Sequence, residues 1–190
     1  MTDPTPQRNS ALDWLIQRLT QLVQAATDAL EQDPAQVEAW QEELSRQLAR
    51  YHAASYLAGS GEAALEGPAK VKVVQDLKTQ LGFLGKFALE IQGAKAWQAG
   101  WNARAAMYAK SIRIPFERGK TKMLPLPSMP CEGTTCLTNC GCMWEIDELD
   151  GDGNADAYWR RGKGDSCQVC KQRERDWSPV KIRDGVLQLG

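Results

Sequence analysis

Six cysteines in the last third of the chain are the residues whose type and spacing could do chemistry. They fall in two groups, Cys131-x4-Cys136-x3-Cys140-x-Cys142 and, after a gap, Cys167-x2-Cys170. Two groups separated by a hairpin suit a four-thiolate site, because each group supplies two sulfurs from a tight turn. We therefore predict a structural zinc site whose ligands are Cys136, Cys140, Cys167 and Cys170.

The choice of these four follows from local geometry. The Cys167–Cys170 spacing is the usual one for a metal-binding turn. Gly141 follows Cys140 and lets backbone N–H groups turn toward the thiolates. Cys142 is the alternate ligand, because two residues apart on a strand its side chain shares a face with Cys140. Cys131 is expected to lie outside the site. A site closed by four sulfurs has no open position, so the metal would be structural and not catalytic.

Three other uses of the cysteines stay open. Disulfides are the first, chiefly if the mature protein spends its life outside a cell. An iron–sulfur cluster is the second, since four or five thiolates could hold one. A Cys167–Cys170 redox pair is the least favoured, because the sequence shows no strand followed by a helix around Cys167, the setting that such pairs use.

An acidic turn between the two cysteine groups could bind a hard cation. It places oxygen-bearing side chains at alternate positions, with Gly153 at the bend: Glu148, Asp150, Asp152, Asn154 and Asp156. This arrangement resembles the calcium loops of EF-hand and propeller-repeat proteins. The competing interpretation is a plain hairpin turn, which favours Asp, Gly and Asn because they tolerate left-handed backbone.

The elements that must position these groups begin with a helical domain over residues 10–115. Residues 1–9 are polar, contain two prolines and are predicted to form an extended arm. Ser10 opens a predicted capping box, and Asp33-Pro34 restarts the helical pattern. Gly59-Ser60-Gly61 is predicted to end the second helix, and Pro115 to close the fourth. About four helices follow, each with apolar residues on one face. The stripes include Leu12, Leu15, Leu19 and Val23; Val37, Trp40, Leu44 and Leu48; Val71, Val74, Leu77, Leu81 and Leu84; and Trp97, Trp101, Ala105 and Tyr108.

Residues 116–190 do not continue the helical pattern of the first part of the chain. Residues 116–135 include alternate prolines that prevent helix formation, and they are predicted to be a strap on a surface. Residues 136–190 are predicted to be a Cys-rich β module, with a hairpin formed by 142–146 and 157–160 and a further short strand at 180–182. The predicted fold class is α+β, mainly α: an antiparallel helical half with a small zinc-stapled β-hairpin module.

The charge and hydropathy of the chain bear on whether it binds nucleic acid or a membrane. The formal net charge is −1, so there is no global attraction to nucleic acid or anionic membrane. A basic run from Arg104 to Lys122 contains one acid, Glu117, and is either a solvated helix face or a contact for DNA or an acidic partner. No apolar run approaches the roughly 20 residues that cross a bilayer. We expect a protein made in a cytosol, with no membrane partner.

The sequence offers little for catalysis. It contains no Gly-rich phosphate loop, no Ser/His/Asp set and no histidine-bearing metal motif. His52 is the only histidine, and the sequence identifies no partner for it. We expect that the protein is not an enzyme.

The C-terminal half resembles the minor head, or head morphogenesis, proteins of tailed bacteriophages, the relatives of the Mu-type minor capsid protein. The resemblance lies in Asn139-Cys-Gly-Cys142 and Asp165-Ser-Cys-Gln-Val-Cys170, with Trp177-Ser-Pro179 after them and the helix ending in Met107-Tyr108 before them. In that family the Cys-x-x-Cys element usually comes first, whereas here it comes second.

The resemblance implies a structural role in the virion, with assembly in the host bacterial cytoplasm. Its implied partners are other virion proteins (capsid, portal or connector), and several copies are expected in a larger assembly. The alternative function is a zinc-module adaptor that binds nucleic acid through the run from Arg104 to Lys122.

Overall fold

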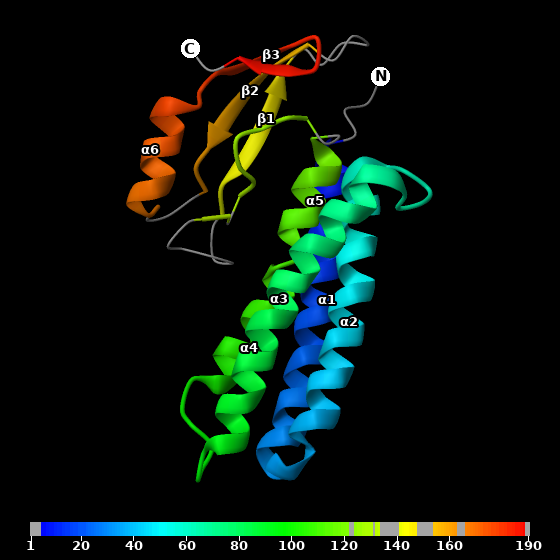
Figure 1. Ribbon diagram of the computed structural model, residues 1–190, viewed down its shortest axis with the longest axis vertical. Coiled ribbons are helices and arrows are strands. Elements are labelled where there is room, and N and C mark those ends of the chain that lie inside the picture. Colours follow the sequence, from blue (N-terminus) through cyan, green and yellow to red (C-terminus); the bar gives the residue numbers. More distant parts are fainter. Residues whose placement is uncertain are drawn as a thin grey trace.

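Two parts make up the molecule: a long helical body and a small sheet with one helix beside it (Figure 1). The computed structural model describes residues 5–121, 124–130, 132–133, 141–147, 154–162 and 166–188, with side chains from residue 10 onward. The helices are α1 (Thr5–Gln32), α2 (Val37–Ser60), α3 (Gly67–Gly93), α4 (Trp101–Lys110), α5 (Arg113–Lys120) and α6 (Gln168–Asp176), and a 3-10 turn, η1, covers Pro34–Gln36. The strands are β1 (Met143–Asp147), β2 (Ala155–Arg160), β3 (Val180–Arg183) and β4 (Val186–Gln188).

A common apolar core holds the helical body together. Each of the helices α1 to α5 contributes one face to it, which confirms the predicted one-sided stripes of the first two helices. Phe87 lies at its centre, in edge contact with Trp40 and Trp101 at ring-centroid distances of 5.8 and 6.0 Å. Such edge-to-face pairs stabilise a core beyond the apolar area that they bury. Trp40, Phe87 and Trp101 are therefore core residues, whereas Trp14 and Phe83 are 61% and 51% exposed.

Local signals place two of the helix boundaries. The Asp33 side chain accepts a hydrogen bond from the backbone N–H of Ala35, and Pro34 begins the 3-10 turn that leads into α2. At the other end of α2, Gly61 adopts a left-handed conformation with φ of 76° and donates its N–H to the carbonyl of Leu57. Both boundaries were predicted from these residues.

Two predicted boundaries near prolines were wrong. The first helix begins at Thr5 and not at Ser10, because Pro6 stands in the first turn, where its missing N–H costs no hydrogen bond. Likewise Pro115 does not close α4, which ends at Lys110, but lies in the first turn of α5. The predicted start of the strap at residue 116 therefore falls within a helix.

Helix α3 has two apolar faces, whereas one was predicted. Its core face carries Val73, Leu84 and Phe87. Val71 and Val74, which were predicted to be in the core, are exposed on the other side. Both sets fit helical spacing, so the apolar pattern alone could not decide which set would be buried.

Helices α2 and α5 cross in backbone contact. A methyl carbon on Gly119 would overlap the carbonyl oxygen of Tyr56 and lie 2.7 Å from the amide nitrogen of Ser60. A methyl carbon on Gly59 would in turn overlap the carbonyl oxygen of Phe116. The Ser55 hydroxyl also donates to the carbonyl of Ile112 at 2.5 Å. This crossing fixes α5, the helix on which the C-terminal module rests.

His52 lies inside the same contact region. It is fully buried, and its Nε2 lies 3.1 Å from the Ser111 hydroxyl. Burial lowers the pKa of the imidazole to about 4, because the charged form would lose its hydration. His52 thus packs in the core as a neutral side chain.

We expect stability to depend on pH through this residue. Between pH 6.5 and about 4 the unfolded chain binds a proton at His52 and the folded chain does not, so the free energy of unfolding falls as the pH drops. The loss should reach roughly 3 kcal/mol, and His52→Gln should remove this part of the pH dependence. Urea unfolding of both proteins from pH 7 to 4 measures it; parallel pH profiles would contradict the assignment.

The C-terminal module is a four-stranded antiparallel sheet in the order β1-β2-β3-β4. The predicted hairpin is confirmed as β1 and β2, with Trp144 opposite Trp159. Asp184 and Gly185, with φ of 52° and 70°, form the two-residue turn between β3 and β4. Helix α6 and strand β4 were not predicted.

Three tryptophans and one arginine hold α6 against the sheet. Trp144, Trp159 and Trp177 contact one another at ring-centroid distances of 5.2 to 6.1 Å. The Arg173 guanidinium of α6 lies 5.3 Å from the ring of Trp159 and 4.8 Å from that of Trp177. Such cation–π contacts add to the apolar packing and hold the last turn of α6 next to the sheet.

Candidate metal centre

The first turn of α6 brings two of the predicted ligands together. Cys167 is the N-cap of α6, Cys170 follows within its first turn, and their sulfur atoms are 3.5 Å apart. Two thiolates on one tetrahedral zinc would be about 3.8 Å apart, given Zn–S bonds of about 2.3 Å, whereas a disulfide bond is about 2.0 Å long. The two sulfurs are therefore in contact without a covalent bond, and they lie slightly closer together than two ligands of one zinc would.

The helix terminus also suits the chemistry of these sulfurs. Backbone N–H groups and the partial positive charge at a helix N-terminus stabilise a thiolate, which is the form that binds metal. Cys170 is fully buried, and Cys167 is half-buried. Strand β2 precedes α6, so the setting of a strand followed by a helix, which the sequence did not reveal, is present.

Cys142 lies in the same apolar core. It is buried together with Cys170, and Cys167 packs against the same cluster. It directly precedes β1, and its burial matches that of Trp144 two residues later, so both face the interior. Across the hairpin, Gly141 and Gly162 touch so closely that a methyl carbon on Gly162 would lie 2.6 Å from the Cα of Gly141. The open end of the hairpin thus places this cysteine near α6.

The remaining cysteines, Cys131, Cys136 and Cys140, lie outside the described residues. Among the residues that the structure describes, no three His, Cys, Asp or Glu side chains lie close enough together to hold a metal ion. The structure therefore brings Cys167 and Cys170 into contact, and the four-thiolate zinc site stays a prediction.

Helix α5 anchors the module through the exposed edge of β1. The Glu117 carboxylate accepts a hydrogen bond from the backbone N–H of Trp144, and Lys120 Nζ donates to its carbonyl at 3.1 Å. Both backbone groups point away from β2, so these two side chains replace a neighbouring strand. Burial raises the pKa of the Glu117 carboxyl, while Lys120, Arg113 and the Trp144 N–H act in the opposite direction.

An ion pair connects α3, α5 and the strap beside this anchor. Arg118 donates two hydrogen bonds to Asp76, at 2.6 and 3.0 Å, and lies 3.8 Å from Glu132. Burial raises the pKa of the Asp76 carboxyl, and the Arg118 bonds lower it. The strap is also held by Trp144, whose indole N–H donates to the carbonyl of Ser128 at 2.8 Å. Glu117 and Lys120 thus join the module directly to the helical body, and Trp144 also joins it to the strap.

The predicted calcium loop is only partly within the described residues. Glu148, Asp150 and Asp152 lie outside them. The Asp156 carboxylate accepts a hydrogen bond from Arg183 at 2.6 Å, and the Asn154 side-chain oxygen accepts one from the N–H of Asp184 at 2.8 Å. These two side chains thus connect β2 to the turn between β3 and β4, and calcium binding stays a prediction.

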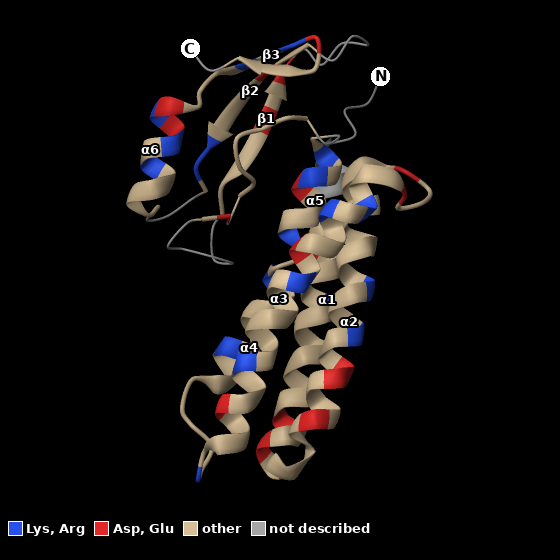
Figure 2. Ribbon diagram, in the orientation of Figure 1, with Lys and Arg blue, Asp and Glu red and all other residues tan. Residues whose placement is uncertain are grey.

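The basic run from Arg104 to Lys122 is not one continuous solvated face (Figure 2). Arg104 pairs with Glu90 at 2.6 Å and lies over the ring of Phe87. Arg118 is bound to Asp76, and Lys120 is bound to the carbonyl of Trp144. Lys122 lies outside the described residues. At least three of the cations thus make contacts within the chain, and this geometry adds no support to DNA binding.

Glu117 and α6 are the parts of the site that the sequence did not identify. Glu117 is the one acid in the basic run, and its spacing of three residues from Lys120 was an available signal. Helix α6 has a polar sequence, Gln168-Val-Cys-Lys-Gln-Arg-Glu-Arg-Asp176, with little apolar periodicity. Its position depends on the contact between Arg173 and the tryptophans, which sequence spacing does not show.

Comparisons with known proteins found no match: no family model, no curated protein and no solved structure is similar to this chain. Among the described helices, none combines the length and apolarity required to span a bilayer.

Proposed function

We propose that the protein is a structural component of a tailed-bacteriophage virion, as a minor head, capsid-associated or head–tail protein. In this proposal a zinc site at the open end of the β1–β2 hairpin makes the C-terminal module rigid, and the protein works by binding other virion proteins. The choice of a phage particle rests on the resemblance of the Asn-Cys-x-Cys and Asp-x-Cys-x-x-Cys elements to those of minor head proteins.

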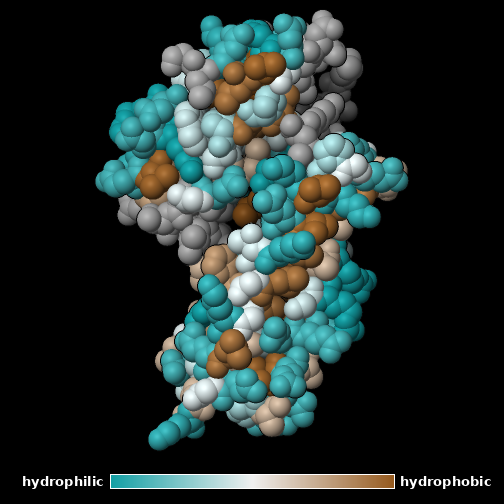
Figure 3. Space-filling view, in the orientation of Figure 1, coloured by the Kyte–Doolittle hydropathy of each residue, from teal (hydrophilic) through white to brown (hydrophobic). Residues whose placement is uncertain are grey.

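The observation that carries the protein-binding role is the outer face of α3. Val71, Phe83 and Leu89 are 66%, 51% and 69% exposed, respectively. Figure 3 shows a band of hydrophobic surface along the helical body, where α3 lies in Figure 1. Large apolar side chains that are exposed along one part of a surface are typical of surfaces that a partner covers.

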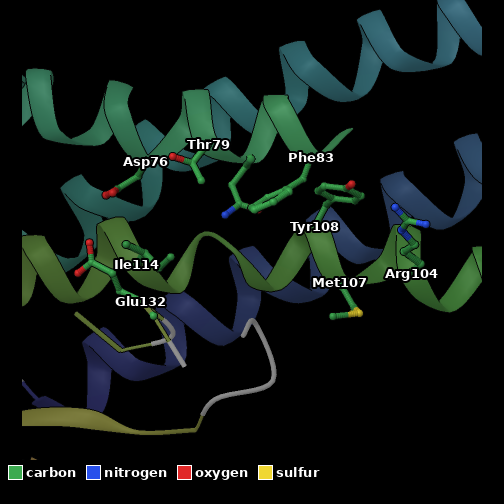
Figure 4. Close-up of a pocket in the computed structure, with 10 residues that line it drawn as sticks. Asp76, Thr79, Phe83, Arg104, Met107, Tyr108, Ile114 and Glu132 are labelled. Carbon is green, nitrogen blue, oxygen red and sulfur yellow. The ribbon is translucent and has the colours of Figure 1, made fainter. Parts of the chain in front are cut away.

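A groove beside this face adds to the same surface. It lies between α3 and α4, has a volume of about 390 Å³, and includes Phe83, Met107 and Ile114 in its lining (Figure 4). Asp76 and Glu132 lie together near one end, and Arg104 near the other (Figure 4). Apolar walls with a few charges suit the docking of a partner's side chains.

The sole histidine is consistent with a non-catalytic role. His52 is buried in the helical core against Ser111, and it does not line the groove. Glu117, the most deeply buried carboxylate described, holds the backbone of Trp144. Both side chains thus have structural partners.

A substitution on the outer face of α3 tests the proposal. Leu89→Asp should fold normally, because the side chain is mostly exposed, and should fail to restore particle yield in a strain from which the gene is deleted. Charge on an apolar contact that becomes buried is expected to cost about 2 kcal/mol or more in assembly. Plaque counts and purified particle yield measure the effect, with circular dichroism as the check on folding.

Gln75→Asp is the matched control, because it adds the same charge to an exposed polar position of α3. It should restore particle yield like the unchanged gene. If Leu89→Asp restores yield equally well, the outer face of α3 is not the docking surface. If deletion of the gene itself leaves particle assembly and infectivity unchanged, the virion function is wrong.

A further inference from the structure

Cys167 and Cys170 are placed for redox chemistry as well as for metal binding. Their sulfur atoms are 3.5 Å apart on one helix turn, so a covalent bond requires closure by about 1.5 Å, given a disulfide length of about 2.0 Å. Residues three apart on a helix turn have adjacent side chains, so rotation about the side-chain bonds can supply this movement. The helix therefore need not unwind for the two sulfurs to join.

The two sulfurs also differ in access. Cys167 is the N-cap and is half-buried, whereas Cys170 is fully buried in the core with Trp159 and Val180. An oxidant in solution thus reaches Cys167 first. Cys170, whose sulfur lies 3.5 Å from that of Cys167, is placed to react with a group already bound to its neighbour. This order of access, on a helix that follows a strand, is the arrangement of a dithiol with one attacking and one resolving cysteine.

We propose that Cys167 and Cys170 form a redox-active dithiol that small disulfides of the glutathione type oxidise reversibly to an intramolecular disulfide. The proposal does not depend on the virion function. It concerns the same two residues as the predicted zinc site, and it adds a second, oxidised state to that site.

The reaction proceeds by two thiol–disulfide exchanges. The Cys167 thiolate attacks one sulfur of the small disulfide, which forms a mixed disulfide and releases one thiolate. The Cys170 thiolate then attacks the Cys167 sulfur, breaks the mixed disulfide and releases the second thiolate. The two protein sulfurs lose two electrons, the small disulfide gains them, and the two thiol protons end on the two small thiols.

Oxidation and metal binding exclude each other at this pair. A sulfur in a disulfide is not a thiolate and no longer a zinc ligand. A disulfide between Cys167 and Cys170 would remove two of the four predicted zinc ligands. Bound zinc would therefore leave as the disulfide forms. Reduction would restore both thiolates and allow zinc to bind again.

The test uses the full-length, unmodified protein, purified under reducing conditions. It is incubated with oxidised glutathione, quenched in acid and denatured, and its remaining thiols are alkylated. Trypsin releases both cysteines on one peptide, residues 164–171. The expected peptide carries no alkyl group and is lighter by two hydrogen atoms than its reduced form. Two glutathione thiols should appear per peptide closed, and dithiothreitol should reverse the change.

Cys142 is the internal control, because it is buried in the same core and should remain alkylated. Cys131→Ser should be oxidised to the same extent as the unmodified protein. A peptide 164–171 that is alkylated at both positions, or a disulfide from Cys167 or Cys170 to another cysteine, would overturn the proposal.

Zinc released during the oxidation is measured in parallel. One zinc lost per disulfide formed supports the exclusion of metal by oxidation. Protein that contains no zinc as purified under reducing conditions would refute the zinc site. Disulfide formation in that protein would still support the dithiol proposal. Zinc retained in full after the disulfide has formed would overturn the claim that this pair binds it.

Discussion

Cys170→Ser is expected to unfold the C-terminal module and to leave the helical body folded. Structural zinc stabilises a small module by on the order of 10 kcal/mol, and the loss of one of four thiolates removes most of that. The buried position adds a smaller cost of about 1–3 kcal/mol, because a serine hydroxyl in the apolar core must find a hydrogen-bond partner. The helices keep their own core and should melt as before.

Three measurements check this expectation. The zinc content should fall from about one per chain to near zero, as four thiolates on one zinc imply. Far-ultraviolet circular dichroism should keep its helical signal, and near-ultraviolet signals from the packed tryptophans of the module should be lost. Cys131→Ser is the control and should leave the zinc content and both circular dichroism signals almost unchanged. If it is as damaging as Cys170→Ser, the ligand assignment is wrong; if zinc content is unchanged in Cys170→Ser, this residue is only a core side chain.

Gly119→Ala is expected to have the second largest effect, on the helical body. The added methyl would overlap the backbone of α2 at Tyr56 and Ser60, and backbone atoms cannot rotate away as a side chain can. Helix α5 would have to move off α2, which we expect to cost at least about 3 kcal/mol. Because Glu117 and Lys120 lie on α5 and hold Trp144, the module should also loosen.

The matched control is Gly82→Ala in α3. No atom lies within 4 Å of the position that its methyl would occupy, and the residue is exposed within a helix. Alanine there should raise the free energy of unfolding by about 0.5–1 kcal/mol, because glycine is a poor helix former. Denaturant unfolding of both variants measures the two effects. Equal and small changes in both would show that α2 and α5 do not cross in backbone contact.

The parts of the fold that the sequence predicted are those set by local chemistry. Leu12, Leu15 and Leu19 recur at helical spacing on one face, and Gly61 ends α2 by its left-handed conformation. The β1–β2 hairpin alternates buried and exposed side chains around its tryptophans. In each case the signal lies within a few residues, so it does not depend on the rest of the chain.

The parts that the sequence missed depend on contacts between distant residues. Val71 and Val74 are as apolar as Val73, and the packing of α3 on α2 decides which face of α3 is buried. Helix α6 is held by Arg173 on two tryptophans of the sheet, which no spacing rule reveals. His52 has its partner 59 residues away at Ser111, so its buried role could not be predicted locally.

In the candidate site, too, the sequence predicted the feature set by nearby residues and missed the one set by distant contacts. The Cys-x-x-Cys spacing predicted the contact between Cys167 and Cys170, because both lie in one helix turn. The anchor between α5 and β1 was not predicted, because Glu117 and Trp144 are far apart in the sequence and meet only after α5 has packed on α2.

Quantitative mass spectrometry of purified phage particles tests the central claim most directly. The particles come from the strain that encodes the protein, and they are banded on a density gradient and treated with nuclease. We predict that the protein stays in the particle band at a fixed ratio to the major capsid protein through repeated purification. A protein that is absent from the band, or whose ratio falls with each step toward zero, would contradict a structural role in the virion.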